Sequence, residues 1–193
     1  MADSNKIKYG IKNCFYAKAT ITSTNTATYD TPVALPGAVS ISLSPEGDTS
    51  PFYADNIVYF TSVANNGYSG TLELAKIPDS FLTDILGYVV DSKGVLLEDA
   101  NASPVHFALM FQFEGDAHAK RSVMYNCVAA RPEISGSTKE ASIAPQTESI
   151  ELTCTTIYNS VLDKDIVKAS CIPAQTSQYN SWTSSVYQTT TTA

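Results

Sequence analysis

The sequence has few of the residues that most often carry chemistry. Its 193 residues include two histidines, four cysteines and one tryptophan. No two cysteines form a C-x-x-C pair, and no histidine lies at zinc-finger spacing from a cysteine. Neither His106 nor His118 has an acid or a nucleophile at a motif spacing. These scarcities argue against a zinc finger and against a catalytic histidine, and the sequence suggests no cofactor.

Basic residues and long apolar runs are also scarce. Lys and Arg number 12 against 19 Asp and Glu, which gives a net charge of −7 and a pI of about 4.7. A protein that grips nucleic acid by its phosphates needs clustered Lys and Arg, whereas a protein that lets DNA pass does not. No apolar run approaches the roughly 20 residues of a membrane span. The opening MADSNKIKYG lacks the apolar core of a signal peptide, so we expect a protein made in, and soluble in, the cytoplasm.

Three acidic residues, Glu46, Asp48 and Asp55, lie close together in the sequence. A pair of carboxylates could serve a glycosidase, and oxygen ligands could hold calcium. The spacing fits no EF-hand loop, and a solvated acidic loop is the simpler interpretation. Gly67-Tyr68-Ser69-Gly70 lacks one residue of a nucleophile elbow, and Gly136 to Lys139 lacks the glycine spacing of a phosphate loop. We therefore expect no catalytic or metal-binding residues.

The cysteines lie among apolar or β-branched residues. This setting predicts buried, reduced thiols in a sheet, and a disulfide in a mature particle outside the cell is the alternative. The four residues are Cys14, Cys127, Cys154 and Cys171.

Strand patterns dominate the chain. Alternating apolar residues, such as Val39, Ile41 and Leu43 or Phe107, Leu109 and Phe111, indicate half-buried strands. Further strands are expected over 6–17, 56–63, 68–77, 88–90, 121–130, 149–158 and 165–172. Asn66-Gly67 and Asp91 to Gly94 have the composition of turns. On strands 68–77 and 149–158, Glu73 and Glu151 alternate with apolar neighbours and should face away from the core.

One short helix is predicted over residues 78–87. Pro78, Asp79 and Ser80 suit a helix start, apolar residues recur at helical spacing after them, and Gly87 closes the segment. The fold should therefore be mainly β, an antiparallel sandwich or barrel with one short flanking helix.

Two segments do not fit this body and suggest contacts. Residues 44–68 form a long polar loop that nevertheless carries Phe52 and Tyr53, and exposed aromatics are typical interface anchors. Residues 173–193 are rich in Thr, Ser and Gln but contain Tyr179, Trp182 and Tyr187. We interpret them as an arm that follows a body of residues 1–172 and docks on that body or on a neighbour. Both segments should be mobile before assembly.

Long stretches of the sequence resemble the major tail proteins of long-tailed bacteriophages, specifically the phi13-type family. The longest is PVALPGAVSISLSPEGDTSPFYADNIVYFTSVANNGYSGTLELAKIPDSF, and KYGIKNCFYA, YNCVAARPEISGSTKEASIAPQTESIELT and YNSWTSSVY follow the same order. The resemblance covers nearly the whole chain and is weakest at residues 20–30 and at the extreme C-terminus.

The resemblance implies a structural, non-enzymatic virion protein that assembles in the host cytoplasm into a tail tube. Rings of such subunits, typically hexameric, stack into a tube that holds the tape measure protein and later passes double-stranded DNA. Tail tip and tail terminator proteins would be further partners. The resemblance favours a tail without a sheath.

The same resemblance assigns roles to residues. The long loop would contact a neighbouring subunit or ring, with Pro51, Phe52, Tyr53, Asp55 and Asn56 at its tip. Asn65, Asn66 and Tyr68 would form its return. Glu73 and Glu151 would face either the lumen, where acidic groups repel DNA, or the outside of the tube.

Two rival functions use the same residues differently. A virion decoration or adhesion module would place its exposed aromatics on a host glycan or protein rather than on another copy. A glycan-cleaving β-domain would use Glu46 and Asp48 as its carboxylate pair. Assembly of the protein without any ligand would distinguish a tube protein from an adhesion module. Loss of glycan turnover in Glu46→Gln would test the glycan-cleaving domain.

Overall fold

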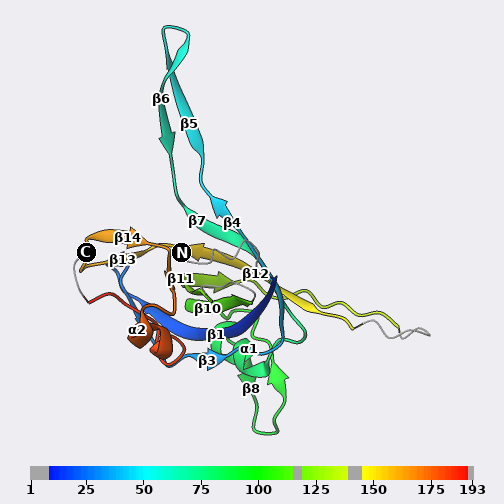
Figure 1. Ribbon diagram of the computed structural model, residues 1–193. Coiled ribbons are helices and arrows are strands. Elements are labelled where there is room, and N and C mark those ends of the chain that lie inside the picture. The colour runs from blue at the N-terminus through cyan, green and yellow to red at the C-terminus, as the bar shows by residue number, and fades with distance from the viewer. Residues whose placement is uncertain (1–8, 115–118, 139–144, 191–193) are drawn as a thin grey trace.

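The computed structural model describes residues 9–114, 119–138 and 145–190, and it is mainly β (Figure 1). The strands are β1 (Tyr9–Ile21), β2 (Ala27–Tyr29), β3 (Val33–Ala34), β4 (Ala38–Glu46), β5 (Thr49–Ala54), β6 (Ile57–Val63), β7 (Gly67–Leu74), β8 (Val89–Val90), β9 (Leu96–Leu97), β10 (Phe107–Glu114), β11 (Arg121–Ala129), β12 (Glu148–Thr155), β13 (Ile157–Asn159), β14 (Lys164–Ile166) and β15 (Lys168–Cys171). The helices are α1 (Asp79–Ile85) and α2 (Thr176–Ser181).

One large antiparallel sheet forms the body. Its strand order is β2-β1-β10-β11-β12-β7-β4, with β3 paired to β1 and β15 paired to β11. The hairpins β5–β6, β8–β9 and β13–β14 are separate two-stranded sheets. The sheet curls, so that residues of the edge strand β4 and of β1 line one surface cleft together. The predicted mainly β, antiparallel fold is confirmed.

The principal core lies inside the curled sheet, and α1 closes it. Phe81 of α1 is fully buried and meets Tyr16 and Phe107 edge to face, with ring centroids 5.1 and 5.5 Å apart. Pro78 precedes the helix with an extended backbone, Asp79 lies in its first turn, and Gly87 follows it at φ 75°. These are the signals that predict this helix, and the structure confirms it.

A second core lies on the outer face of the sheet. The chain after β15 passes over β10 and β11, where Trp182 packs with Met110, Val123 and Tyr125. Trp182 is only 3% exposed and stacks on Tyr187 with centroids 5.6 Å apart. The arm therefore packs on its own body in this structure, and its mobility before assembly stays a prediction. The division at residue 173 stays a prediction.

The sequence does not predict α2. The segment has neither an acidic first turn nor a side-chain cap, and its residues are Thr, Ser, Gln, Tyr and Asn. Such residues have modest helix propensity. Packing beside the second core, rather than local preference, explains this short helix.

The prediction that Asn66-Gly67 forms a hairpin turn is wrong. The chain reverses at Asp55-Asn56 instead, and Asn66 continues the ladder by donating its backbone N–H to the carbonyl of Glu46 at 2.9 Å. Gly67 begins β7 at φ 105°, and a Cβ there would lie 2.0 Å from the Cys154 carbonyl oxygen. The glycine is needed because another strand lies close to it.

All four cysteines are buried free thiols, and burial raises the pKa of Cys14 to about 12. Cys127 and Cys154 face each other across β11 and β12, with their Sγ atoms 2.8 Å apart. If a disulfide formed within the body, it would join Cys127 and Cys154.

Replacing Gly67 by alanine should lower the free energy of unfolding by about 2–3 kcal/mol, because strain at positive φ adds to the overlap with Cys154. Gly94 is the matched control, since it has φ 82° but no atom within 4 Å of the position that a Cβ would take. Gly94→Ala should cost about 1 kcal/mol. Urea unfolding followed by circular dichroism measures both, and equal losses would contradict the close-approach explanation.

Replacing Trp182 by alanine should lower the free energy of unfolding by about 3–5 kcal/mol, because it empties the second core. The buried indole N–H has no hydrogen-bond partner among the described residues. Trp182→Phe should therefore cost clearly less than Trp182→Ala, since it keeps a ring and removes an unsatisfied donor. Thermal unfolding compares the two, and a Trp182→Ala protein as stable as wild type would show that the arm does not belong to the folded body.

Candidate interaction surfaces

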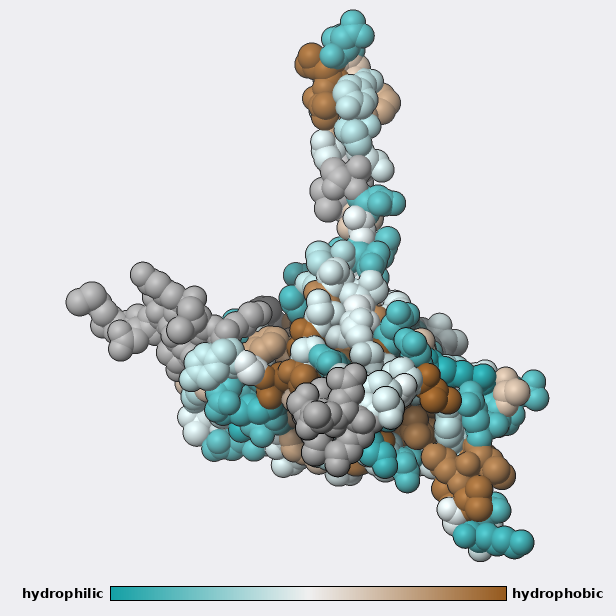
Figure 2. All heavy atoms as spheres, turned by 90° about the vertical axis from the view of Figure 1, so that its right-hand side faces the viewer, coloured by the Kyte–Doolittle hydropathy of each residue, from teal (hydrophilic) through white to brown (hydrophobic). Residues whose placement is uncertain are grey.

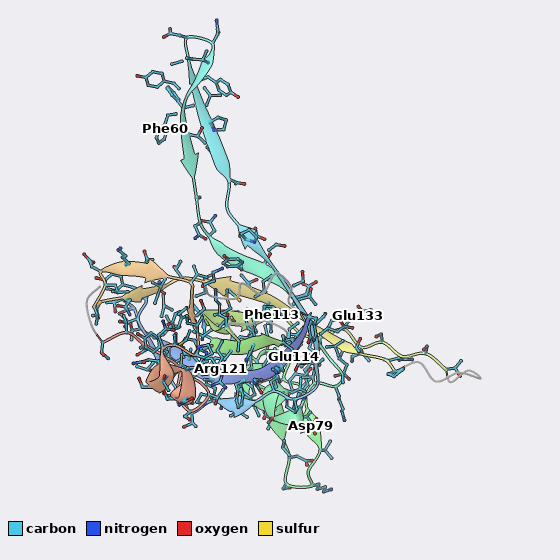
Figure 3. All side chains as sticks on the ribbon, in the orientation of Figure 1. Phe60, Asp79, Phe113, Glu114, Arg121 and Glu133 are labelled. Atoms are coloured by element: carbon cyan, nitrogen blue, oxygen red, sulfur yellow. The ribbon has the colours of Figure 1, made fainter. Side chains whose placement is uncertain are left out.

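The β5–β6 hairpin, called here the apolar hairpin (residues 49–63), stands away from the body (Figure 1). Figure 3 shows its side chains, Phe60 among them, clear of the rest of the protein. Its large apolar side chains are 52–72% exposed. They are Phe52, Tyr53, Ile57, Val58, Tyr59 and Phe60.

Local sequence explains why this segment is a hairpin rather than a loop. Asp55 and Asn56 have φ values of 51° and 62°, and Asp and Asn are among the non-glycine residues that best tolerate this conformation. Two such residues in succession make the tight turn whose twist suits a hairpin. Phe52 lies opposite Phe60, and Tyr53 lies opposite Val58, across the two strands.

The residues predicted for the loop fall into two places. Asp55 and Asn56 form the turn of the apolar hairpin, Phe52 and Tyr53 lie on the adjoining strand, and Pro51 lies further from the turn, opposite Thr61. Their contact with a neighbouring subunit or ring stays a prediction.

Asn65, Asn66 and Tyr68 lie instead at the foot of the hairpin. Asn65 Oδ1 accepts the backbone N–H of Gly67 at 3.2 Å. The Lys168 ammonium lies 4.7 Å from the centre of the Tyr68 ring and donates to its hydroxyl at 2.8 Å. These residues fix where the hairpin leaves the body, and their proposed contact with a neighbour stays a prediction.

Sequence reasoning missed the role of the returning strand. The sequence predicts a strand over 56–63 but gives no function to Ile57, Val58, Tyr59 and Phe60, which supply most of the apolar surface of the hairpin. The available signal is the unbroken apolar run itself, because a strand with one buried face would alternate with polar residues.

A second surface is the outer face of β4, β7 and β12, called here the polar face. None of these three strands contains Lys or Arg. The arm covers the neighbouring strands β10 and β11 but leaves this half of the sheet open. The outward side chains are small hydroxyls and three carboxylates: Ser40, Ser42, Ser44, Glu46, Ser69, Thr71, Glu73, Ser149, Glu151, Thr153 and Thr155.

Glu73 and Glu151 both lie on the polar face, on the opposite side of the sheet from buried Leu72, Leu74 and Leu152. Glu73 accepts hydrogen bonds from Thr147 Oγ1 at 2.5 Å and from Ser40 Oγ at 2.7 Å. These bonds, that of Thr147 first, lower the pKa of the Glu73 carboxyl below its ordinary value of 4.5. Glu73 is therefore ionised at neutral pH.

The edge of the sheet at β4 is a third surface. β4 pairs with β7 on one side and ends the sheet. Two clefts beside it share Ile41 and Phe113 in their lining, and the larger has a volume of about 410 Å³. A free strand edge is a place where another chain can add.

The aromatic anchors of the arm all contact their own chain. Tyr179 lies under the Arg121 guanidinium, 4.1 Å from ring centre to Cζ, and its carbonyl accepts from Arg121 Nη1 at 2.6 Å. Tyr187 accepts through its carbonyl from the Tyr125 hydroxyl at 2.9 Å. Together with Trp182, these residues pack on the body of their own chain, and a contact of the arm with a neighbouring subunit stays a prediction.

The acidic residues considered for calcium or glycan cleavage do not form one site. Asp55 lies at the turn of the apolar hairpin, whereas Glu46 and Asp48 lie near its foot. The Glu46 carboxylate accepts a hydrogen bond from the Ser69 hydroxyl. Among residues 9–114, 119–138 and 145–190, no group of His, Cys, Asp and Glu could hold a metal. No helix in these ranges is long and apolar enough to cross a membrane.

Comparison with known proteins gives little beyond this geometry. No family model matches the chain. No curated protein matches it. Among solved structures, the chain is similar to one in the 6-fold symmetrised cryo-EM structure of the anti-feeding prophage baseplate, at 10% identity and a TM-score of 0.36, over 86% of this chain and 97% of the other. A superposition this loose assigns neither a family nor a role.

Glu73→Gln tests the hydrogen bonds on the polar face. Because the folded state lowers the pKa of Glu73, the carboxylate adds stability above pH 4.5 and loses it as the pH falls below that value. The stability difference between wild type and Glu73→Gln should therefore shrink on acidification. Glu151→Gln is the control, since no hydrogen bond to the Glu151 carboxylate exists among the described residues. Thermal unfolding across this pH range measures both, and parallel curves for the two variants would contradict the assignment.

Proposed function

We propose that this chain is the structural subunit of a phage tail tube and has no enzymatic activity. Copies join side by side into rings, hexameric by resemblance to the major tail proteins, and the rings stack. The tube then holds a tape measure protein, meets tail tip and terminator proteins at its ends, and passes double-stranded DNA. The virion tail would be its final location, after assembly in the host cytoplasm.

The observation that carries this proposal is the apolar hairpin. Six large apolar side chains are more than half exposed on a two-stranded ribbon that is a sheet of its own. A lone hairpin is marginally stable in water, and such side chains cost free energy while they remain hydrated. Burial against another copy removes that cost, so the shape and composition of the hairpin favour assembly.

The polar face supports a lumen. A surface of hydroxyls and carboxylates without Lys or Arg offers phosphates no cation to bind, and its negative charge repels them. It lies on strands next to the β4 edge, so lateral addition at that edge would continue the same face from one subunit to the next. In this arrangement Glu73 and Glu151 face the DNA.

Negative-stain electron microscopy of the concentrated protein at neutral pH tests the proposal. Rings or hollow tubes are expected without any added ligand, and class averages give the ring symmetry. A protein that stays monomeric and binds glycans or a host protein would replace the tube by the adhesion module.

The double variant Phe52→Ala/Tyr53→Ala should remain a folded monomer but lose assembly, because both side chains are more than 60% exposed and contribute little to the body. Thr61→Ala is the matched control, since Thr61 is exposed on the same hairpin and is not aromatic. Sedimentation and electron microscopy compare the three proteins. Tubes of wild-type yield and length in the double variant would remove the hairpin from the assembly interface.

A further inference from the structure

A second exposed apolar hairpin lies at the other end of the molecule. β8 and β9, with the turn between them, form residues 89–97 and leave the body on the side of α1, away from the apolar hairpin (Figure 1). Four of its apolar side chains are 50–54% exposed, namely Val89, Val90, Val95 and Leu97, and Leu96 is partly buried. Figure 2 shows a hydrophobic patch at each of these two ends.

The fold of the chain does not account for this patch. The turn is already held by Asp91, whose Oδ1 accepts the backbone N–H groups of Lys93 and Val95 at 2.8 Å each. The exposed side chains belong to neither buried core. The hairpin is thus a capped element with an apolar surface that neither core of its own chain covers.

The two hairpins complement each other in charge. Asp55 is the sole charged residue of the apolar hairpin, and it lies in its turn. On residues 89–97 the Asp91 carboxylate is occupied by the turn, and Lys93 is exposed with no ion pair among the described residues. Each apolar surface therefore ends in one available charge, and the two charges are opposite in sign.

We propose that the apolar hairpin of one copy packs on the β8–β9 hairpin of a second copy in the adjacent ring, with Asp55 near Lys93. This inference rests on the proposed tube. Two different patches at opposite ends make a head-to-tail contact, which repeats without closing and so can extend a stack indefinitely. Contact between two copies of the same patch would end after one pair.

Cross-linking tests the pairing directly. Ala54→Cys protein is mixed with Ser92→Cys protein, assembled, and treated with a short bismaleimide, while the four natural cysteines remain buried. These positions adjoin Asp55 and Lys93 and leave the large apolar side chains of both hairpins intact. Cross-linked dimers should form in the mixture but in neither variant alone. Replacing the Ser92→Cys partner by Thr24→Cys, an exposed position in the turn after β1, should leave at least about tenfold fewer dimers.

Charge exchange provides a second measurement. Asp55→Lys and Lys93→Asp should each lower the yield of sedimenting tubes, and the double exchange should restore it, because the pair is rebuilt with reversed signs. Ser92→Ala, in the same turn as Lys93, should assemble like wild type. Each variant is first shown by circular dichroism to fold.

The outcomes separate this inference from the proposed function. If wild-type protein forms tubes but the mixture yields no specific dimers and the double exchange restores nothing, the β8–β9 hairpin has another role and the inference is wrong. If wild-type protein forms neither rings nor tubes, the proposed function itself fails. Specific dimers together with restored tubes establish the contact.

Discussion

The antiparallel pairing of β4 with β7 is the constraint on which the other features depend. This ladder runs from Ala38 opposite Leu74 to Glu46 opposite Gly67. Its inward residues Leu72 and Leu74 are fully buried in the principal core, and its outward residues form much of the polar face. The same two strands then leave the body and continue as β5 and β6. Core, polar face and apolar hairpin are therefore set by one register, and a slip of one residue would exchange the faces.

The sheet is covered unequally, and this asymmetry separates the surfaces. One face encloses the principal core beneath α1. The other face is covered by the arm over β10 and β11, where Trp182 is buried. Over β12, β7 and β4 its outward side chains are left exposed or partly exposed by the described residues. A bare face of a sheet needs polar side chains, which the alternation on these strands supplies. The arm therefore covers the apolar half of the outer face, over β10 and β11, and leaves the polar face uncovered.

Alternation makes most of the body predictable. β7 and β12 alternate apolar and polar residues, so both the strands and the outward direction of Glu73 and Glu151 can be inferred from sequence. The helix α1 is predictable because Pro78, Asp79 and Gly87 mark its ends. The apolar hairpin is predictable only as an exposed aromatic loop, because its strands have no buried face and thus no alternation.

Two other features cannot be read from sequence for physical reasons. The sequence Asn66-Gly67 is compatible with a hairpin turn, and it is equally compatible with a strand in which the glycine lies against a neighbouring strand. Only the three-dimensional position of Cys154 next to Gly67 shows that the second arrangement is present. The turn-forming pair, Asp55-Asn56, lacks glycine and is a weaker signal. The helix α2 forms where the arm meets Arg121 and the second core, so its cause lies in residues more than fifty positions away.

The apolar hairpin and the β8–β9 hairpin both expose apolar side chains whose hydration costs free energy in the single chain. Folding of a single chain gains little from either, since most of the large apolar side chains described in them stay at least half exposed. Isolated strand pairs of this kind are marginal in water, and exposed apolar edges favour uncontrolled association. The Asp55-Asn56 turn and the Asp91 carboxylate hold each ribbon in shape without a core, which lowers the ordering cost when a partner binds. Preformed ribbons at opposite ends direct association along one axis, so the apolar surface that would otherwise promote aggregation instead specifies a stack.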